Sequence, residues 1–148
     1  MKAYIFQSVY RDMLQEAALY PDTETGGVWL GQLCQDRWII THNIRPGPQA
    51  VHQPGCFAYD HAYVLEQARR CIEASRKPIG ILGYWHTHTS GRDTFSEEDG
   101  PLNEQYAALR ETGALCGIVT NRGGMELALY QVHLPLRYEK MEYNIMEE

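Results

Sequence analysis

The sequence has none of the features that mark a membrane protein, a secreted protein or a nucleic-acid binder. No stretch approaches the roughly 20 consecutive apolar residues of a membrane-spanning helix. The N-terminal segment reaches Arg11 and Asp12 too early to contain the apolar stretch of a signal peptide. Acidic residues outnumber basic ones by 19 to 13, and the net charge of −6 argues against a basic face for phosphates. We therefore expect a cytoplasmic protein that binds neither membrane nor nucleic acid.

Close cysteine pairs are also missing. The four cysteines, at positions 34, 56, 71 and 116, form no C-x-x-C pair for a metal site, and their spacing does not suit a dense disulfide framework. A nucleobase deaminase would need such a pair as zinc ligands, so this class of enzyme is not favoured. We expect the four cysteines to be buried free thiols in a reducing cytosol.

A length of 148 residues, with 44% hydrophobic and 22% charged residues, predicts one folded domain over residues 1–148. Strand and helix patterns alternate along it without an internal repeat, which indicates an α/β or α+β fold with a single mixed β-sheet flanked by helices. The expected strands cover residues 2–6, 27–34, 37–42, 79–88, 114–120 and 125–133, and the expected helices cover 8–19, 60–75 and 101–111.

Three segments lie outside this framework. Residues 43–59 contain three prolines and two glycines and predict a long loop, which is either a wall of a substrate groove or a plain surface connection. Residues 121–124 predict a turn between two strands. Residues 134–148 predict an edge strand with a loose end. In the helix over 60–75, Asp60 is the expected N-cap, and the apolar spacing predicts an inner face formed by Ala62, Leu65, Ala68 and Ile72.

The segment from 83 to 99 carries a candidate metal site. Residues two apart in a strand face the same side, so His86 and His88 project together while Thr87 points the other way. Two imidazoles on one face form half of a zinc site, although a half-buried strand can also carry histidines for hydrogen bonding. Asp99 follows after a loop long enough to fold back and supply an oxygen ligand. Three protein ligands would leave the fourth tetrahedral position for water, as in catalytic zinc sites.

Asp99 has a second interpretation. Ser96 and Asp99 fit a capping box, with serine at the N-cap and a carboxylate three residues later. A helix that begins at Ser96 would place Pro101 beyond its first position, which speaks against this interpretation. The two roles are compatible, because a capping turn would hold Asp99 near the end of the strand. The spacing leaves both open.

Glu24 stands where a turn enters a strand, and taken alone it is no more than a solvated charge. It begins the run E-x-x-G-x-x-x-G with Gly27 and Gly31. Downstream follow H-x-H, seven residues, serine, two residues and aspartate, so that the pattern ends at Asp99. This complete pattern resembles the signature of the JAMM metalloproteases, also called the MPN+ or JAB family.

The resemblance implies an MPN/JAB domain of cytidine deaminase-like architecture with one Zn²⁺ per chain. In that family's terms, Glu24 would be the general acid/base and Ser96 would support the oxyanion. The zinc ion would be bound by His86, His88 and Asp99.

Two departures from the family pattern concern the loop after the second histidine. Thr89 and Phe95 stand where many members carry proline, which puts the rigidity of this loop in question. The chain also lacks the additional histidines and cysteines with which some eukaryotic members bind a second, structural zinc.

The resemblance further implies a protein substrate. The expected activity is that of a metallopeptidase or isopeptidase, which hydrolyses the bond after the C-terminal tail of a ubiquitin-like protein. One alternative is a peptidase that processes sulfur-carrier or phage-tail proteins. An alternative of another class is a non-catalytic MPN scaffold that only binds a partner.

Overall fold

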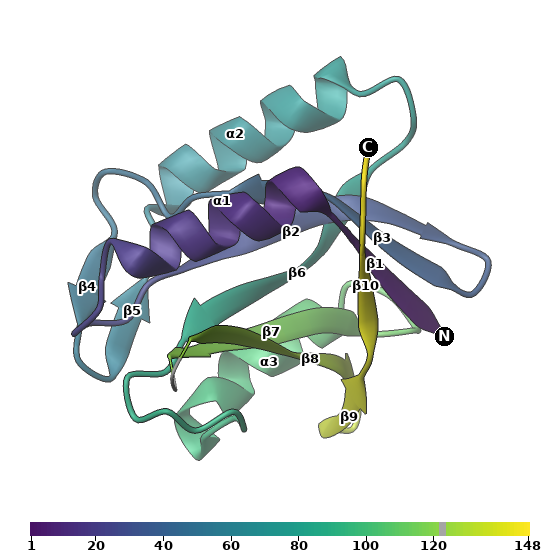
Figure 1. Ribbon diagram of the computed structural model, residues 1–148. Coiled ribbons are helices and arrows are strands. Elements are labelled where there is room, and N and C mark those ends of the chain that lie inside the picture. Colours follow the sequence, from purple (N-terminus) through teal and green to yellow (C-terminus); the bar gives the residue numbers. More distant parts are fainter. Residues whose placement is uncertain (122–123) are drawn as a thin grey trace.

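Figure 1 shows the computed structural model, which describes residues 1–121 and 124–148. Within these residues, eight strands form one mixed sheet in the order β10-β1-β3-β2-β6-β7-β8-β9. The strands of this sheet are β1 (Lys2–Phe6), β2 (Gly26–Cys34), β3 (Arg37–Ile44), β6 (Gly80–Thr87), β7 (Ala114–Asn121), β8 (Met125–His133), β9 (Arg137–Met141) and β10 (Tyr143–Met146). The other elements are the helices α1 (Gln7–Ala18), α2 (His61–Ala74) and α3 (Gly100–Ala107), the 3₁₀ turn η1 (Glu97–Asp99) and the hairpin of β4 (Val51–Gln53) and β5 (Cys56–Ala58). The expected fold class is confirmed.

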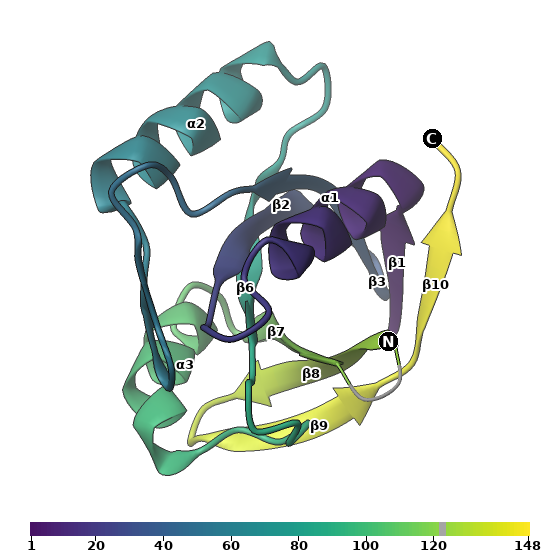
Figure 2. The same cartoon turned by 60° about the vertical axis from the view of Figure 1, so that its left-hand side comes forward.

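The main sheet curls so strongly that its two edge strands follow each other in the chain (Figure 2). Strands β9 and β10 stand at opposite ends of the strand order, yet Glu142 is the only residue between them. The hydroxyl of Tyr143 in β10 donates a hydrogen bond of 3.2 Å to the carbonyl oxygen of Leu127 in β8. The C-terminal segment, expected to be one edge strand with a loose end, therefore supplies both edges of the sheet.

Helix α1 lies in the hollow of the curled sheet (Figure 2). Its helical spacing turns Val9 and Met13 toward the sheet, where both are buried. Three large side chains from β2, β3 and β6 are fully buried in the same core: Trp29, Trp38 and Trp85. Because each such ring removes a large apolar area from water, this core contributes much of the stabilisation that holds α1 against the sheet.

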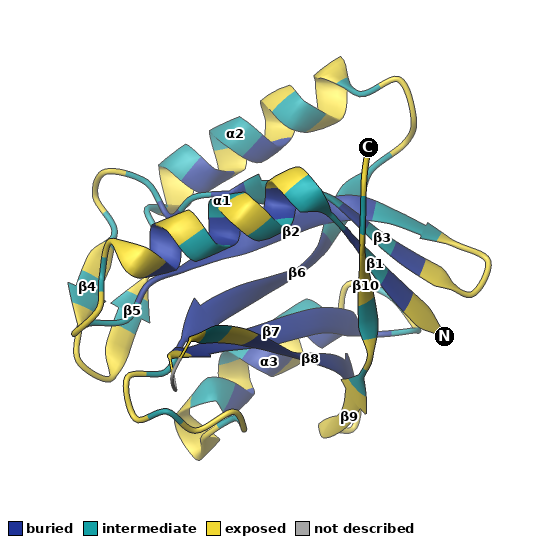
Figure 3. Ribbon diagram, viewed as in Figure 1, coloured by how far each residue is buried: buried dark blue, intermediate teal, exposed yellow. Residues whose placement is uncertain are grey.

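Helices α2 and α3 cover the outer face of the sheet, and Figure 3 shows their buried residues on the sides that face it. A second core joins Val64 of α2 and Ala107 of α3 to Tyr84 of β6. Strand β6 lies between β2 and β7 in the sheet, with the α1 core on one face and the core of α2 and α3 on the other. Residues 82–87 are therefore all buried. The end of β6 is therefore one of the most firmly enclosed points of the fold.

The inner face expected for α2 is wrong. Leu65 and Ile72 are 64% and 41% exposed, whereas Val64 and Ala68 are buried. Both sets of residues share Ala68 and both recur at helical spacing, so periodicity alone does not distinguish them. The docking of α2 decides, because the smaller side chains of Val64 and Ala68 let the helix lie close to the buried Ile44 of β3.

The loop expected over residues 43–59 is wrong in two parts, since β3 continues to Ile44 and since β4 and β5 pair as an antiparallel hairpin. Gly55, with a φ of 69°, allows the tight turn between these strands. The expected cap of the following helix is confirmed, because an Asp60 carboxylate oxygen accepts a hydrogen bond of 3.2 Å from the backbone N–H of Tyr63. The helix expected to reach residue 111 ends at Ala107 instead.

All four cysteines are free, but the expected burial is confirmed for Cys116 alone. Cys34 and Cys56 are exposed, Cys71 is partly exposed and Cys116 is buried. Cys34 ends β2 at a turn and Cys56 opens β5 on the hairpin, and at both places the chain leaves the packed sheet.

The turn expected at 121–124 includes residues 122–123, which lie outside the described residues. No helix in the described part of the chain is long and apolar enough to cross a membrane.

The packing of α2 can be tested with two neighbouring substitutions. We expect Val64→Ser to lower the free energy of unfolding by about 2 kcal/mol, because a buried aliphatic group is lost. We expect Leu65→Ser, the matched control on the exposed face, to change it by less than about 0.5 kcal/mol. Chemical unfolding followed by circular dichroism measures both. A larger loss in Leu65→Ser would contradict this orientation of α2.

Candidate metal centre

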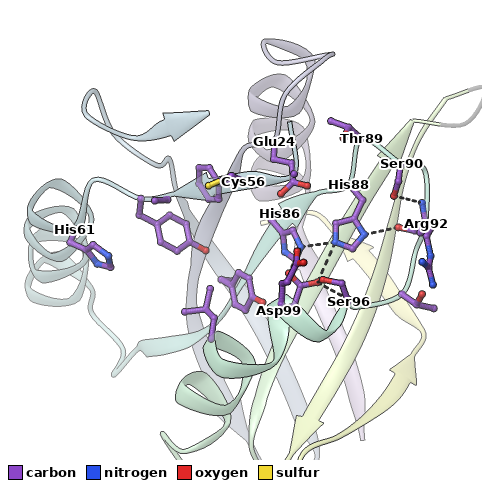
Figure 4. Close-up of a pocket in the computed structure, with 18 residues that line it drawn as sticks. Glu24, Cys56, His61, His86, His88, Thr89, Ser90, Arg92, Ser96 and Asp99 are labelled. Carbon is purple, nitrogen blue, oxygen red and sulfur yellow. Dashed lines mark hydrogen bonds and ion pairs between the residues drawn. The ribbon is translucent and has the colours of Figure 1, made fainter. Parts of the chain in front are cut away.

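Strand β6 and the residue that follows its end carry two histidines into one pocket (Figure 4). His86 and His88 face the same side, as strand geometry predicts, and their Nε2 atoms lie 2.8 Å apart. The ring of His86 is buried and packs nearly parallel to that of Tyr84, with an interplanar angle of 9°. This packing restricts the orientation of the ring before any metal ion is considered.

Asp99 reaches the same point from the 3₁₀ turn η1. Its Oδ1 lies 3.4 Å from His86 Nε2, and its Oδ2 lies 3.4 Å from His88 Nε2. Asp99 also completes a capping box, because its Oδ2 accepts hydrogen bonds from the backbone N–H of Ser96 at 2.9 Å and from the hydroxyl of Ser96 at 3.1 Å. The two interpretations of Asp99 are thus compatible: the carboxylate that caps the turn lies beside both histidines.

Pro101 does not conflict with this cap, because the capping turn and the helix are separate elements. The turn η1 ends at Asp99, and α3 begins at Gly100, which puts Pro101 in the first turn of α3. Proline is well tolerated there, since the first N–H groups of a helix have no intrahelical partner.

The distances suit a tetrahedral metal ion. Two atoms that each lie about 2.0–2.1 Å from zinc are about 3.3 Å apart at the tetrahedral angle. Each histidine–aspartate distance of 3.4 Å is close to this value, but the first is to Oδ1 and the second to Oδ2, so the carboxylate would have to turn to place one oxygen at this distance from both nitrogens. The two histidine nitrogens would have to separate by about 0.5 Å from their 2.8 Å distance to reach it. Among the described residues, the one group of His, Cys, Asp and Glu side chains placed to hold a metal ion is His86, His88 and Asp99.

The tautomer of His88 also suits metal binding. Its Nδ1 lies 2.8 Å from the carbonyl oxygen of Arg92. A carbonyl oxygen only accepts, so Nδ1 carries the hydrogen and Nε2 keeps its lone pair for a metal ion. A backbone carbonyl in this position is a common outer partner of metal-binding histidines.

The charges in this cluster favour a cation. Burial alone would raise the pKa of the Asp99 carboxyl, but hydrogen bonds from His86 and His88 hold it well below its usual range. Burial lowers the pKa of His88, but the hydrogen bonds to Asp99 and to the Arg92 carbonyl outweigh it and raise the pKa. The carboxylate therefore stays ionised, and positive charge is favoured beside it, whether protons or a metal ion supply it.

Glu24 lines the same pocket from the loop before β2 (Figure 4). The hairpin holds its backbone at two points: its N–H donates to the carbonyl oxygen of Gln53 at 3.1 Å, and His52 Nδ1 lies 3.1 Å from its carbonyl oxygen. Burial raises the pKa of the Glu24 carboxyl, against the lowering effect of His86 and His88. A carboxylate whose pKa is shifted toward neutral is better suited to accept and return a proton.

Two threonines behind the pocket fix Glu24 relative to the histidines, and sequence reasoning missed their role. The N–H of Thr25 donates to the hydroxyl of Thr87 at 2.9 Å, and the N–H of Thr87 donates to the carbonyl oxygen of Thr25 at 2.8 Å. The hydroxyl of Thr25 in turn donates to the buried carboxylate of Glu16 at 2.8 Å. The available signal was the alternation of the H-x-H segment, which turns the Thr87 side chain to the face of the strand opposite the two histidines.

The glycine of the E-x-x-G run permits a close approach between strands. A Cβ at Gly27 would lie 2.5 Å from Trp85 Nε1 and 2.7 Å from Asn43 Oδ1, two atoms that are themselves hydrogen-bonded at 2.8 Å. Any larger residue would push β2 away from β6. Gly27 therefore helps to set the distance between the loop that carries Glu24 and the strand that carries His86.

The pocket in front of these groups has a volume of about 590 Å³. Its walls are residues 55–59 of the hairpin on one side and the loop after His88 on the other. Ser96 lines it too, but its hydroxyl donates to Asp99, so this hydrogen would have to turn away to reach an oxyanion. The structure thus brings all five predicted site residues into one pocket, and their individual roles stay predictions.

Comparisons with known proteins place the chain beside one family and one solved fold. The family described as prokaryotic homologs of the JAB domain matches residues 6–130, a range that includes all five of these residues. A protein named probable metalloprotease y4qB from Sinorhizobium fredii is 29% identical over 90 residues, which cover 60% of this chain and 55% of that protein. This chain thus matches about half the length of that relative.

A solved structure shares the fold. Protein DSY2949 from Desulfitobacterium hafniense superposes with a TM-score of 0.76 over 99% of this chain and 94% of that chain, at 16% sequence identity.

Removal of one ligand should weaken metal binding strongly. We expect the purified chain to bind about one divalent metal ion, and His88→Ala to weaken this binding by more than about 100-fold, because a three-residue site loses one donor. His61→Ala is the matched control, since His61 lines the same pocket outside the ligand group. Metal analysis after gel filtration and competition with a chelating dye measure both. Equal metal content in the two variants would contradict the assignment.

Proposed function

This chain belongs to the prokaryotic homologs of the JAB domain, and on that premise we propose that residues 1–148 form a zinc-dependent peptidase domain. The proposed zinc ligands are His86, His88 and Asp99, and the proposed general acid/base is Glu24. The observation that carries the proposal is the convergence of these four side chains on one pocket, with three potential ligand atoms on one side and a partly buried carboxylate of raised pKa on the other.

Peptide hydrolysis requires an activated water, a polarised carbonyl and a proton for the departing amine. A zinc ion at this site would act as a Lewis acid and lower the pKa of water toward about 7. Glu24 would accept the proton of the attacking water and then deliver it to the amine. Ser96 would donate a hydrogen bond to the developing oxyanion once its hydroxyl turns from Asp99. None of the four cysteines is needed as a nucleophile.

The substrate we propose is the C-terminal tail of a ubiquitin-like protein, joined through a peptide or isopeptide bond. An extended tail could lie along the hairpin β4–β5, whose residues 55–59 line the pocket beside the metal ligands. Val51 on this hairpin is 42% exposed. In the described part of the chain β5 pairs with no strand but β4, so its outer edge is the one available for an added strand, whereas β4 already accepts a hydrogen bond from Glu24 through Gln53. We therefore favour a substrate-binding role for the segment over that of a plain surface connection.

Replacement of the proposed base should separate chemistry from metal binding. We expect Glu24→Gln to keep the metal ion and to lower turnover by about 10²–10⁴-fold, because the amide does not accept the proton of water. Glu98→Gln is the matched control, since Glu98 lines the same pocket without membership of the ligand group. Steady-state cleavage assays on any processed substrate, with metal analysis of each variant, measure the effect. Turnover at the wild-type rate in Glu24→Gln would contradict the role of Glu24 as general acid/base.

The substrate class can be tested with a panel of fusion proteins. Ubiquitin-like proteins with C-terminal extensions and with lysine-linked partners are incubated with the chain, with and without the chelator 1,10-phenanthroline. We expect chelator-sensitive cleavage at the end of the ubiquitin-like tail. Cleavage only of sulfur-carrier or phage-tail precursors would assign the chain to that processing instead. Stable binding without cleavage by the metal-loaded chain would indicate a scaffold and contradict the proposed activity.

A further inference from the structure

The loop over residues 89–95 connects the two halves of the proposed metal site. It follows His88 directly, supplies the Arg92 carbonyl oxygen that orients the His88 ring, and leads into Ser96 and the turn with Asp99. The loop is polar, contains Gly91 and has no proline, so its backbone has many conformations available. Something outside the loop must restrict it if the ligands are to keep their positions.

Phe95 makes the contacts that provide this restriction. Its ring stacks on Tyr138 of β9 with centroids 4.7 Å apart and meets the edge of Tyr130 of β8 at 5.2 Å. Its third aromatic neighbour is His86, at 6.0 Å. Offset and edge-to-face pairs at these distances are attractive and fix the relative orientation of the rings. Phe95, the residue before the capping turn, is thus packed firmly against strands β8 and β9 of the sheet.

Both tyrosines are themselves held in place. The hydroxyl of Tyr130 donates a hydrogen bond of 2.6 Å to the backbone carbonyl of Asp93, in the middle of the loop. The hydroxyl of Tyr138 accepts a hydrogen bond of 2.7 Å from the side chain of Asn103, which is fully buried in α3. The loop is therefore attached through the Phe95 ring and the Asp93 carbonyl to strands that do not carry any of the proposed ligands, and the Asp93 carboxylate adds an exposed ion pair of 3.5 Å with Lys140 of β9.

From these contacts we infer that Phe95, Tyr130 and Tyr138 form an aromatic anchor that positions the loop, and with it His88 and Asp99, for tight metal binding. This inference rests on the proposed metal site. The anchor acts on either side of Phe95. Upstream, the Asp93 contact fixes the segment that presents the Arg92 carbonyl to His88; downstream, the Phe95 ring fixes the start of the capping turn that holds Asp99. These three are positioning residues, since they contact His86, the loop or one another and are not among the residues that line the pocket.

The test compares two tyrosine hydroxyls that each donate to a backbone carbonyl. Tyr130→Phe removes the bond to Asp93 and keeps the ring, whereas the control Tyr143→Phe removes the bond from Tyr143 to the Leu127 carbonyl, away from the loop. Phe95→Ala removes the ring of the anchor altogether. Zinc affinity is measured by competition with a chelating dye, and amide hydrogen exchange is measured across residues 89–96 in the zinc-free protein.

We expect Phe95→Ala to weaken zinc binding by about 10–100-fold, the range found for outer partners of metal ligands. Tyr130→Phe should weaken it several-fold, and Tyr143→Phe should leave it unchanged. Exchange across residues 89–96 should accelerate in the first two variants and not in the third. If Phe95→Ala does not fold, Tyr130→Phe against Tyr143→Phe decides alone.

Two results would overturn different conclusions. Unchanged zinc affinity and unchanged exchange in folded Phe95→Ala and Tyr130→Phe would overturn the anchor, even if both variants melt at a lower temperature. A wild-type chain that does not bind zinc would overturn the proposed function itself. The exchange measurement in zinc-free protein still reports on the attachment of the loop in that case.

Discussion

The enclosure of strand β6 between β2 and β7 is the constraint on which the rest of the site depends. The strand is buried on both faces up to Thr87, so the direction of His86 is set by the core and not by the pocket. The register with β2 places Gly26 opposite His86 and brings Glu24 to the same end of the sheet. The two histidines and Glu24 are thus joined by the backbone pairing of β2 with β6, which tolerates little relative movement.

The remaining ligand comes from outside this rigid unit and needs its own support. Asp99 lies in a short 3₁₀ turn, a weak element that does not hold a position alone. The capping bonds from Ser96 fix the carboxylate within the turn, and the ring of Phe95 fixes the turn against the sheet. Desolvation of three polar groups is unfavourable, and their mutual hydrogen bonds, or a metal ion between them, offset it. The capping bonds of Ser96 and the packing of Phe95 therefore both hold the Asp99 carboxylate beside the histidines.

Alternation and helical spacing are local properties of the chain, and they predicted the class of fold and most strand positions. The five residues that meet in the pocket were predicted as a set by the resemblance to a family signature, since geometry alone indicated only the two histidines and left Asp99 open. Features that depend on tertiary contacts were not predictable in the same way. The face of α2 was assigned to Leu65 because helical spacing does not say which stripe docks. The pairing of Thr25 with Thr87 joins residues far apart in sequence. The departure at Phe95 suggested a less rigid loop, whereas the structure packs this ring between two distant tyrosines.

The hairpin β4–β5 links the proposed substrate groove to the proposed base. It lines the pocket with residues 55–59, and it also holds the Glu24 backbone through Gln53 and His52. The ring of His52 is stacked on Tyr20 at 3.7 Å, which fixes the hairpin to the segment after α1. A substrate tail that packs on β5 would consequently act on Glu24 as well, because β5 is paired with β4, which holds the Glu24 backbone. Binding energy from the tail could then contribute to placement of the carboxylate, and a peptide too short to reach the hairpin would lose turnover as well as affinity.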